Sequence, residues 1–523
     1  MECNIDDLPD VVLEYILSLI PPYKNLQECK LVSKRWFRAT KNVIQHNKAH
    51  FHKSVAYGSL LWSPWPPEHG TPTIAKRHSH SACTYENSMY VFGGCTARYT
   101  TFNDLWRLDL DTRKWIRLIT MGTYPSPRGC ATMLYYKKSF ILFGGWSHPE
   151  LCSVYQQLKF YNELHVYSIE SNRWIVINTL ETPPPTSAHS ASIHKNYMIV
   201  FGGICNGYRS NDVWCLNLDS YSWHKQATSN LKPQPRYGQC QIELGDKHLL
   251  VLGGCTGPND VMNDAWLLKM EGTAWTWKKV NMHNTEWAPT RIWGHQACKV
   301  GNYVVVLSIS KCQNKPNDMS ISFKKVTCQT APSARTSNAS SSLHGRQGSV
   351  SHVDRDVNIN GRHGSFSGIS IQNPRPSHHP PNIKKNFTLC YDNMLSMTAF
   401  RNEPVRYNSH RQNQLECFHR VAERVRYEKM QSKSAKKARN TLSIFVLDIT
   451  NVLCDECSAS WIPLQRNGQS GPNERVLYSL VAGRGELIVF GGIGKEQASS
   501  YPEMYEPKVY NDLHFINPPR YVI

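Results

Sequence analysis

The feature that most constrains the fold is a pair of adjacent glycines that recurs after short apolar segments. The pairs begin at residues 93, 144, 202 and 253, so the steps between them are 51, 58 and 51 residues. In the first repeat, a strand is predicted at 89–92, the glycine pair follows, and a second strand begins after Asn103 and Asp104. Every repeat then ends with a tryptophan: Trp115, Trp174, Trp223 and Trp275.

A period of about fifty residues with several short strands per repeat is typical of a kelch β-propeller. The glycine pair permits positive φ and a tight turn close to the propeller axis. The Asn-Asp pair supplies side-chain hydrogen bonds to free backbone groups of the turn. The tryptophan fills the wedge between neighbouring sheets. One sheet cannot bury both of its faces alone, so the repeats must stack around an axis.

The sequence predicts six blades in a closed ring. Residues 59–66 look like an outer strand with no blade in front of it, whereas the last blade, within 472–523, has no closing tryptophan. We therefore expect 59–66 to complete the last sheet, which removes two edges that would otherwise be exposed. The other five blades are predicted to begin near residues 77, 127, 185, 235 and 289.

A basic insertion interrupts the fifth blade at 309–440 and divides the propeller into 59–308 and 441–523. This insertion holds 22 Lys and Arg against 8 Asp and Glu, in a chain of net charge +19. Its abundance of Ser, Gly, Asn and Arg predicts disorder, with a candidate helix at 414–439. A solvated loop, an acidic or phosphorylated partner, a nuclear-import signal and weak nucleic-acid contact all remain open. Nucleic acid is not the favoured partner.

Residues 3–46 predict a separate module of three helices, which a connector at 47–58 joins to the propeller. Two prolines end the first helix at 21–22, and Ser33 is the predicted N-cap of the third helix. These helices carry more apolar surface than about forty-five residues can bury alone. They either pack on the propeller or leave a groove for an obligate partner.

The segment LPDVVLEYILSLIPPYKNLQECKLVSKRWF at 8–37 resembles the F-box. F-boxes dock on a Skp-family adaptor and, through it, on a cullin scaffold. The resemblance implies that the following residues bind the adaptor or support its binding surface: Leu8, Pro9, Val12, Leu13, Ile16, Leu17, Leu31, Val32 and Trp36. An F-box followed by kelch repeats is similar to the substrate receptors of SCF-type ubiquitin ligases.

The resemblance also implies that the propeller captures a protein substrate at one face of the disc. The candidate residues on this face are arginines, aromatic residues and a histidine of the first-strand starts and loops: Arg77, Arg98, Tyr99, Arg128, Trp146, His148, Tyr208, Arg209, Arg236 and Arg291. Such a combination is typical of a recognition surface. The alternative for each first-strand arginine is a structural bond to blade carbonyls.

The expected function is therefore that of a non-catalytic receptor, with ubiquitination and proteasomal degradation of the captured protein. The alternative is a kelch scaffold that acts without degradation. No catalytic residue and no cofactor is predicted, and no metal site either, since the CxxC motif at 454–457 lacks a second pair. Seventeen scattered cysteines, with no signal peptide and no membrane span, predict a cytoplasmic or nuclear protein with reduced thiols.

Overall fold

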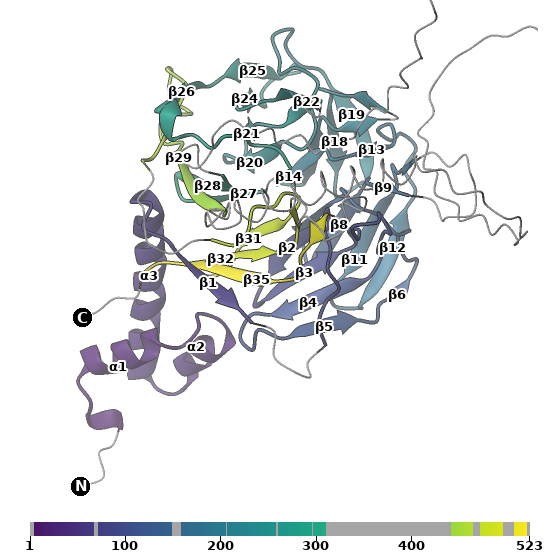
Figure 1. Ribbon diagram of the computed structural model, residues 1–523. Coiled ribbons are helices and arrows are strands. Elements are labelled where there is room, and N and C mark those ends of the chain that lie inside the picture. Colours follow the sequence, from purple (N-terminus) through teal and green to yellow (C-terminus); the bar gives the residue numbers. More distant parts are fainter. Residues whose placement is uncertain are drawn as a thin grey trace, which may run out of the picture. The chain divides into compact units, whose positions relative to one another are not determined.

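The computed structural model describes residues 5–66, 72–148, 158–205, 207–257, 260–294, 296–309, 441–463, 471–494 and 507–519. These residues belong to one compact unit, which begins with helices and continues as a series of small antiparallel sheets (Figure 1). The predicted insertion at 309–440, with its candidate helix at 414–439, lies outside them apart from Ile309. None of the described helices is both long enough and apolar enough to cross a membrane.

The N-terminal helices are η1 (Ile5–Asp7), α1 (Asp10–Ser18), α2 (Lys24–Glu28), η2 (Cys29–Leu31) and α3 (Lys34–Ala56). Ser33 is the N-cap of α3, as predicted, because its hydroxyl accepts a hydrogen bond from the Trp36 N–H at 3.2 Å. The predicted connector at 47–58 is wrong, since α3 continues through most of it. The reason is that Phe51 and Val55 are buried in an apolar cluster with strands of the propeller, which holds this part of the chain helical.

Six sheets of four or five strands follow, and in each of them four antiparallel strands run from an innermost strand outward. Blade 1 consists of β2 (Ser81–Tyr85), β3 (Ser88–Phe92), β4 (Leu105–Asp109) and β5 (Trp115–Leu118), and blade 2 of β7 (Thr132–Tyr136), β8 (Ser139–Phe143), β11 (Leu164–Ser168) and β12 (Arg173–Ile177). Blade 3 consists of β14 (Ser190–His194), β15 (Tyr197–Phe201), β18 (Val213–Asn217) and β19 (Ser222–Gln226), and blade 4 of β20 (Cys240–Glu243), β21 (His248–Leu252), β24 (Ala265–Lys269) and β25 (Thr276–Lys279). Blade 5 consists of β27 (Ala297–Val300), β28 (Tyr303–Ser308), β29 (Ser443–Asp448) and β30 (Ser458–Trp461), and blade 6 of β31 (Ser479–Ala482), β32 (Leu487–Phe490), β35 (Leu513–Asn517) and β1 (Leu61–Trp65).

Shorter elements extend the blades and form their loops. Blades 2 and 5 gain a parallel outermost strand, β6 (Met121–Gly122) beside β12 and β26 (Asn281–His283) beside β30. The loops between second and third strands contain the short hairpins β9–β10 (Trp146–Ser147, Lys159–Phe160), β16–β17 (Ile204–Cys205, Tyr208–Arg209), β22–β23 (Cys255–Gly257, Asp260–Val261) and β33–β34 (Ile493–Gly494, Lys508–Val509). Strand β13 (Thr186–Ser187) pairs with β16, and the 3₁₀ helix η3 (Thr285–Trp287) precedes blade 5.

The blades close into a ring. Their innermost strands contact one another in the order β2, β7, β14, β20, β27, β31 and back to β2. Just before each innermost strand, a backbone N–H donates a hydrogen bond of 2.8–3.0 Å to the corresponding carbonyl of the preceding blade. The residues of this axial hydrogen-bond cycle are Ser79, Cys130, Ala188, Gly238, Gly294 and Leu477. All six have positive φ, a conformation that L-residues other than Gly adopt only at a cost. The six-bladed prediction is thereby confirmed.

The first strand of the chain completes the last blade. Strand β1, within the segment 59–66, pairs antiparallel with β35 from Leu61 opposite Asn517 to Trp65 opposite Leu513. The two strands are close neighbours in Figure 1 although they lie near opposite ends of the sequence. This pairing covers the outer edge of β35 with backbone hydrogen bonds.

Outer-strand tryptophans pack on the phenylalanine that ends the second strand of the preceding blade. The pairs are Trp115–Phe490, Trp174–Phe92, Trp223–Phe143 and Trp277–Phe201, with ring centroids 4.8–5.3 Å apart. The prediction that Trp275 takes this position in blade 4 is wrong. Strand β25 begins at Thr276, and its register with β24 places Trp277 opposite Leu268 and inside the wedge.

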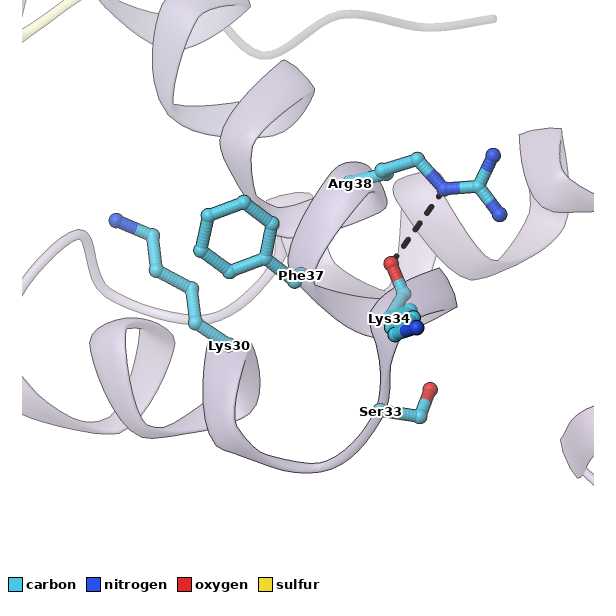
Figure 2. A pocket seen from close by; sticks show the side chains of 5 residues that line it. All are labelled: Lys30, Ser33, Lys34, Phe37 and Arg38. Carbon is cyan, nitrogen blue, oxygen red and sulfur yellow. Dashed lines mark hydrogen bonds between the residues drawn. The ribbon is translucent and has the colours of Figure 1, made fainter.

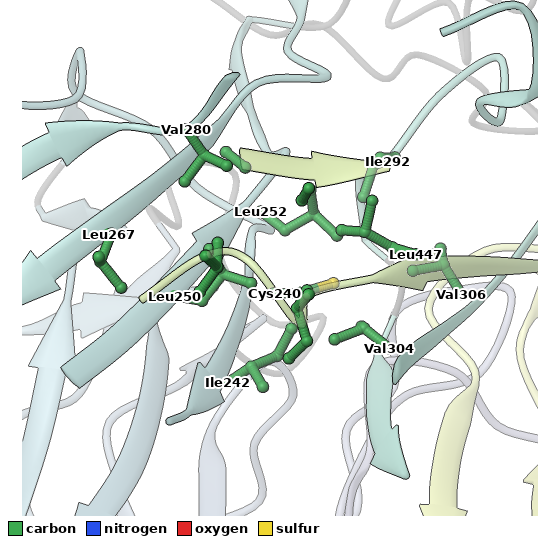
Figure 3. Packing of buried hydrophobic residues seen from close by; sticks show 14 of the residues in the cluster. Cys240, Ile242, Leu250, Leu252, Leu267, Val280, Ile292, Val304, Val306 and Leu447 are labelled. Atoms are coloured by element: carbon green, nitrogen blue, oxygen red, sulfur yellow. The ribbon is translucent and has the colours of Figure 1, made fainter. Parts of the chain in front are cut away.

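Neighbouring blades share apolar clusters, and the cluster between blades 4 and 5 is the example in Figure 3. Blade 4 contributes Cys240, Ile242, Leu250, Leu252 and Leu267, and blade 5 contributes Val304, Val306 and Leu447. Each fully buried aliphatic side chain stabilises the fold by about 1.5–3 kcal/mol relative to its exposed state. The alternation of apolar residues along the strands therefore fixes the blade-to-blade contacts.

Gly253, the first glycine of the pair in blade 4, offers a test of the close approach between blades. Its φ is +68°, and a Cβ at this position would lie 2.2 Å from the Ile292 carbonyl oxygen. Gly245, in a turn of the same blade, has φ of +80° with no described atom within 4 Å of a Cβ. We expect Gly253→Ala to lower the free energy of unfolding by about 2–4 kcal/mol and Gly245→Ala by about 1 kcal/mol. Denaturant unfolding measures both, and equal losses would contradict the clash.

Candidate functional site

The nine residues assigned to adaptor binding occupy different environments in the helical module. Leu13 and Leu17 are buried in the helical core with Leu26, Ala39 and Val43. The partly buried Trp36 packs against this core, and Leu8 and Ile16 are also partly buried. The residues whose side chains are exposed are Pro9, Val12, Leu31 and Val32. The first group therefore supports the fold, and only the last group is available in full to a partner.

The exposed members lie on a surface with large apolar side chains. Leu31 is 84% exposed, Val32 61% and Phe37 48%. Phe37 was not among the predicted contacts, although it ends the quoted F-box segment. We call Val12, Leu31, Val32 and Phe37 the apolar helical surface. Large apolar side chains that a small helical module leaves exposed mark a site of protein interaction more often than ordinary surface does.

A basic hollow adjoins this surface. Its volume is about 460 Å³, and it is lined by Lys30, Ser33, Lys34, Phe37 and Arg38. In Figure 2 the side chains of Lys30 and Arg38 extend on opposite sides of the Phe37 ring. The Arg38 Nε donates to the Lys34 carbonyl at 3.4 Å, which orients the guanidinium group. An apolar floor with a cationic rim is suited to an acidic partner that also carries an apolar side chain.

Tyr23, at the start of α2, anchors the helices to blades 1 and 6. It is fully buried, and its hydroxyl donates to Glu486 in the turn between β31 and β32. Arg113, in the turn between β4 and β5, pairs with the same carboxylate at 2.9 Å, and the Lys24 N–H donates to Asp111 at 2.9 Å. Burial, together with the charge of Glu486, raises the pKa of Tyr23, so the phenol stays protonated and remains a donor.

The helices attach at one end of the propeller strands, which distinguishes that end from the other. Tyr23 and the end of α3 contact the turns that join first to second and third to fourth strands, at Glu486, Arg113 and Gly301. Because neighbouring strands are antiparallel, the loops between second and third strands leave from the opposite ends. We call these loops, with the segments that lead into the innermost strands, the loop face.

Three predicted recognition arginines are buried beneath the loop face. Arg77, Arg128 and Arg236 are at most 1% exposed. The Arg77 guanidinium donates to the Gly93 carbonyl at 2.9 Å and to the two oxygens of Asp104 at 2.7 and 3.0 Å. Equivalent bonds hold the other two arginines, with a glutamate and an aspartate as the carboxylates, in the pairs Arg128–Glu163 and Arg236–Asp264. The prediction that these three arginines contact a substrate is wrong, because their guanidinium groups are buried and hydrogen-bonded inside the blades.

The same position is also an arginine in blade 6, but not in blade 5. In blade 6 it is held by Arg475, which donates to the Gly491 carbonyl and pairs with Asp512. This residue was not predicted, although it lies four residues before Ser479, as Arg77 lies four before Ser81. In blade 5 the position belongs to Ile292, since its carbonyl accepts from Gly254 as that of Arg77 accepts from Gly492. Arg291 is therefore adjacent to this set and only partly buried.

The remaining predicted residues do lie on the loop face. Arg98, His148, Tyr208 and Arg209 are exposed, and Tyr99 and Trp146 are partly exposed. The rings of Tyr99 and Trp146 lie 6.2 Å apart and join the loops of blades 1 and 2. Two aromatic residues outside the predicted set, Tyr237 and Trp293, lie 6.3 Å apart and join blades 4 and 5. The sequence feature that could have identified these two aromatic residues is their position directly before the axial residues Gly238 and Gly294.

Two buried histidines of the propeller serve its structure. His80 and His189 bond the hydroxyls of Ser479 and Thr132 across blade boundaries. Burial lowers the pKa of His189 to about 3 and holds that of His80 well below its ordinary value, so both are neutral. Among the described residues, no three His, Cys, Asp or Glu side chains are arranged to hold a metal ion.

Comparison with known proteins finds two domain models that match parts of the chain. Residues 5–48 match the model of the F-box domain, and residues 77–275 match the model described as "FBX42, beta-propeller domain". The first covers η1 to α3, and the second covers blades 1 to 3 and most of blade 4. The chain thus carries an F-box domain and an FBX42-type propeller domain.

Two curated relatives each match less than half of the chain. Kelch domain-containing protein 2 of Bos taurus is 28% identical over 236 residues, 42% of this chain and 57% of the relative. Leucine-zipper-like transcriptional regulator 1 homolog of Drosophila melanogaster is 26% identical over 251 residues, 47% of this chain and 25% of the relative. The match thus spans less than two thirds of each relative. A solved structure entitled "Structure of YjhT" aligns with 12% identity and a TM-score of 0.45, over 84% of this chain and 95% of that one.

Proposed function

We propose that this chain, with its F-box domain and its FBX42-type propeller domain, is the substrate-recognition subunit of an SCF-type ubiquitin ligase. The F-box would dock on a Skp-family adaptor and through it on a cullin scaffold. The propeller would hold a protein substrate for ubiquitination by an enzyme carried elsewhere in the complex, which is catalysis by proximity. The observation that carries the proposal is the apolar helical surface, because it stays exposed within a segment that matches the F-box.

The attachment of the helices supports a division of labour between the two ends of the propeller. Tyr23, Glu486 and Arg113 hold the F-box at the turn ends of blades 6 and 1, and α3 packs its buried Phe51 and Val55 against blades 5 and 6. The contacts of Tyr23 and of the end of α3 lie at the turn ends, opposite to the loop face. An adaptor on the apolar helical surface and a substrate on the loop face would therefore not compete for the same residues.

A pair of charge substitutions tests adaptor docking. We expect Leu31→Asp with Val32→Asp to weaken binding of purified Skp-family adaptor by at least about 30-fold, because each places a charge in an apolar contact. Both side chains are more than 60% exposed, so the fold should be unchanged. The matched control is Leu180→Asp, at a leucine of the propeller that is 108% exposed. Binding is measured by calorimetry, and equal affinity of the double variant and the control would rule out docking at this surface.

The same double variant separates a ligase receptor from a scaffold. Proteins that proximity labelling finds beside both the wild type and the variant are candidates for loop-face partners. If the chain directs degradation, some of them should have longer half-lives in cells that express the variant. If all of their half-lives are unchanged while adaptor binding is lost, the scaffold alternative is favoured instead.

A further inference from the structure

The loop face carries aromatic side chains close to the propeller axis. Trp293 lies against the axial residue Gly238, since a Cβ on that glycine would be 2.8 Å from the indole Nε1. Tyr237 contacts Trp293 edge to face, with ring centroids 6.3 Å apart. On the opposite blades, the partly exposed Trp146 contacts Tyr99. The axial hydrogen-bond cycle is thus bordered on two sides by flat apolar groups that are suited to contact with a bound chain.

Arg209 lies close to one of these aromatic residues, Tyr237, because its positive charge acts on the Tyr237 phenol. It is exposed at the end of the β16–β17 hairpin of blade 3, next to Tyr208, which is 79% exposed. Its guanidinium reaches blade 4, because its terminal nitrogen would be 3.8 Å from a Cβ at Gly257. Within the described part of the chain, no hydrogen bond or ion pair holds this guanidinium. The N–H donors of this guanidinium are therefore not used by the described part of the fold.

Four carboxylates near the loop face, among the residues that the structure describes, are already paired with cations. Asp104, Asp264 and Asp512 each accept bonds from a buried arginine, and Asp212 pairs with Lys225 at 2.9 Å. Burial would raise the pKa of each of the first three, but hydrogen bonds outweigh it and the pKa values are lowered. The bonds come from the arginine for Asp104 and Asp264, and from His514 and the arginine for Asp512. These groups are thus fixed as charged and paired. The exposed carboxylate that remains in the hairpin beside Arg209 is Asp260, which accepts a bond from the Thr256 hydroxyl.

Two lysines add to the positive charge on the same face. Lys159 of β10 and Lys508 of β34 occupy equivalent positions in blades 2 and 6, over the rings of Tyr161 and Tyr510 at 5.0 and 5.2 Å. Both are exposed, and neither has an ion pair among the residues that the structure describes. With Arg209 they place three cations around the axis, in blades 2, 3 and 6.

From this arrangement we infer that the loop face binds an acidic segment of a partner protein, with a carboxylate on Arg209 and a neighbouring apolar side chain against Trp293 and Tyr237. The inference rests on the proposed function, since it names the class of substrate that the propeller would recognise. A carboxylate can take two parallel hydrogen bonds from one guanidinium, and the adjoining rings exclude water from that contact. Asp and Glu side chains, not phosphate groups, are the anions proposed.

The test uses the full-length chain and an array of synthetic twelve-residue peptides of random, known sequence. We expect the bound peptides to be enriched in Asp and Glu, and the strongest of them to contain an aromatic or aliphatic residue nearby. Arg209→Gln should weaken the strongest peptides by about 5- to 30-fold, and Arg209→Lys by less, because lysine keeps the charge but loses the paired donors. Arg173→Gln, at an exposed arginine of the outer strand β12, is the matched control and should change nothing.

Several outcomes would overturn the inference. Peptides without acidic enrichment, equal loss in Arg209→Gln and Arg173→Gln, or binding only by phosphorylated versions of the peptides each contradict it. The Leu31→Asp, Val32→Asp variant keeps this test separate from the proposed function. That variant should bind the acidic peptides as the wild type does. Adaptor binding without acidic peptide binding refutes only the inference, and the reverse refutes only the ligase role.

Discussion

Replacing Arg77 by Met should lower the free energy of unfolding by about 3–5 kcal/mol, because it leaves a largely buried carboxylate without its partner. The Arg77 side chain is 0% exposed and that of Asp104 is 14% exposed. The substitution also removes the bond to the Gly93 carbonyl and the contact of the guanidinium with the Phe102 ring at 4.3 Å. The backbone of Arg77 is hydrogen-bonded to Tyr510 and Gly492 of blade 6. The lost stability therefore concerns the contact between blades 1 and 6, where the ring closes.

Denaturant unfolding of the full chain measures this effect, with Arg98→Met as the control at an exposed arginine of the same blade. The control should stay within about 0.5 kcal/mol of the wild type. Adding Asp104→Leu to Arg77→Met should restore part of the stability, since it removes the unpaired charge. A loss below about 1 kcal/mol for Arg77→Met would show that the pair does not hold the ring together.

The dependence of this loss on pH has a definite sign. The bonds from Arg77 outweigh burial and hold the pKa of Asp104 below its ordinary value. A carboxylate with a lowered pKa in the folded state contributes stability above its unfolded pKa and loses it as pH falls through the folded pKa. The difference between the wild type and Arg77→Met should therefore be full at neutral pH and shrink in strong acid.

Trp62→Ala in the closing strand should cost about 3–5 kcal/mol, the usual loss for a large aromatic residue removed from a core. Trp62 is 8% exposed and shares a cluster with Phe51 and Val55 of α3 and with Leu487 and Ile516 of blade 6. Its indole thus joins the helical module to the last blade and to the strand that completes it. The substitution should loosen all three together.

Trp65, three residues further along the same strand, provides the matched control. It is 39% exposed and contacts Phe515 at 6.3 Å between ring centroids. We expect Trp65→Ala to cost no more than about 1 kcal/mol. Limited proteolysis can follow the closing strand directly, because a detached β1 exposes backbone around it. If Trp62→Ala and Trp65→Ala are equally stable and equally resistant to protease, β1 does not lock the ring.

The propeller was predictable because the residues that form its turns and its contacts between sheets recur visibly in the sequence. A glycine pair, an Asn followed by Asp or Glu, and an aromatic residue recur about every fifty residues, and each has a physical reason. The error at Trp275 came from a blade with two tryptophans, Trp275 and Trp277, where spacing alone does not show which one faces inward. Strand register decides that, and register depends on the pairing of β24 with β25.

The candidate sites were predictable only in part. Resemblance identified the F-box segment, but composition could not separate the buried Leu13 and Leu17 from the exposed Leu31 and Val32. That separation depends on how α1 packs against α3. On the propeller, an arginine at the start of a strand is equally compatible with a surface contact and with a buried ion pair. The partner decides it, and Asp104 lies 27 residues away from Arg77 in the sequence.

The pairing of β1 with β35 also sets an order of events during synthesis. Leu61 leaves the ribosome 456 residues before Asn517, its partner in the sheet. At about 5–20 residues per second, that interval is roughly 20–90 s. Throughout it, β1 is an unpaired strand that carries Trp62 and Trp65, and blade 1 has no neighbour on its open side. An unpaired strand of this kind is a hazard for wrong pairing in the nascent chain. The firm seating of the F-box on the ring becomes a late step, available only to chains whose last blade has been translated.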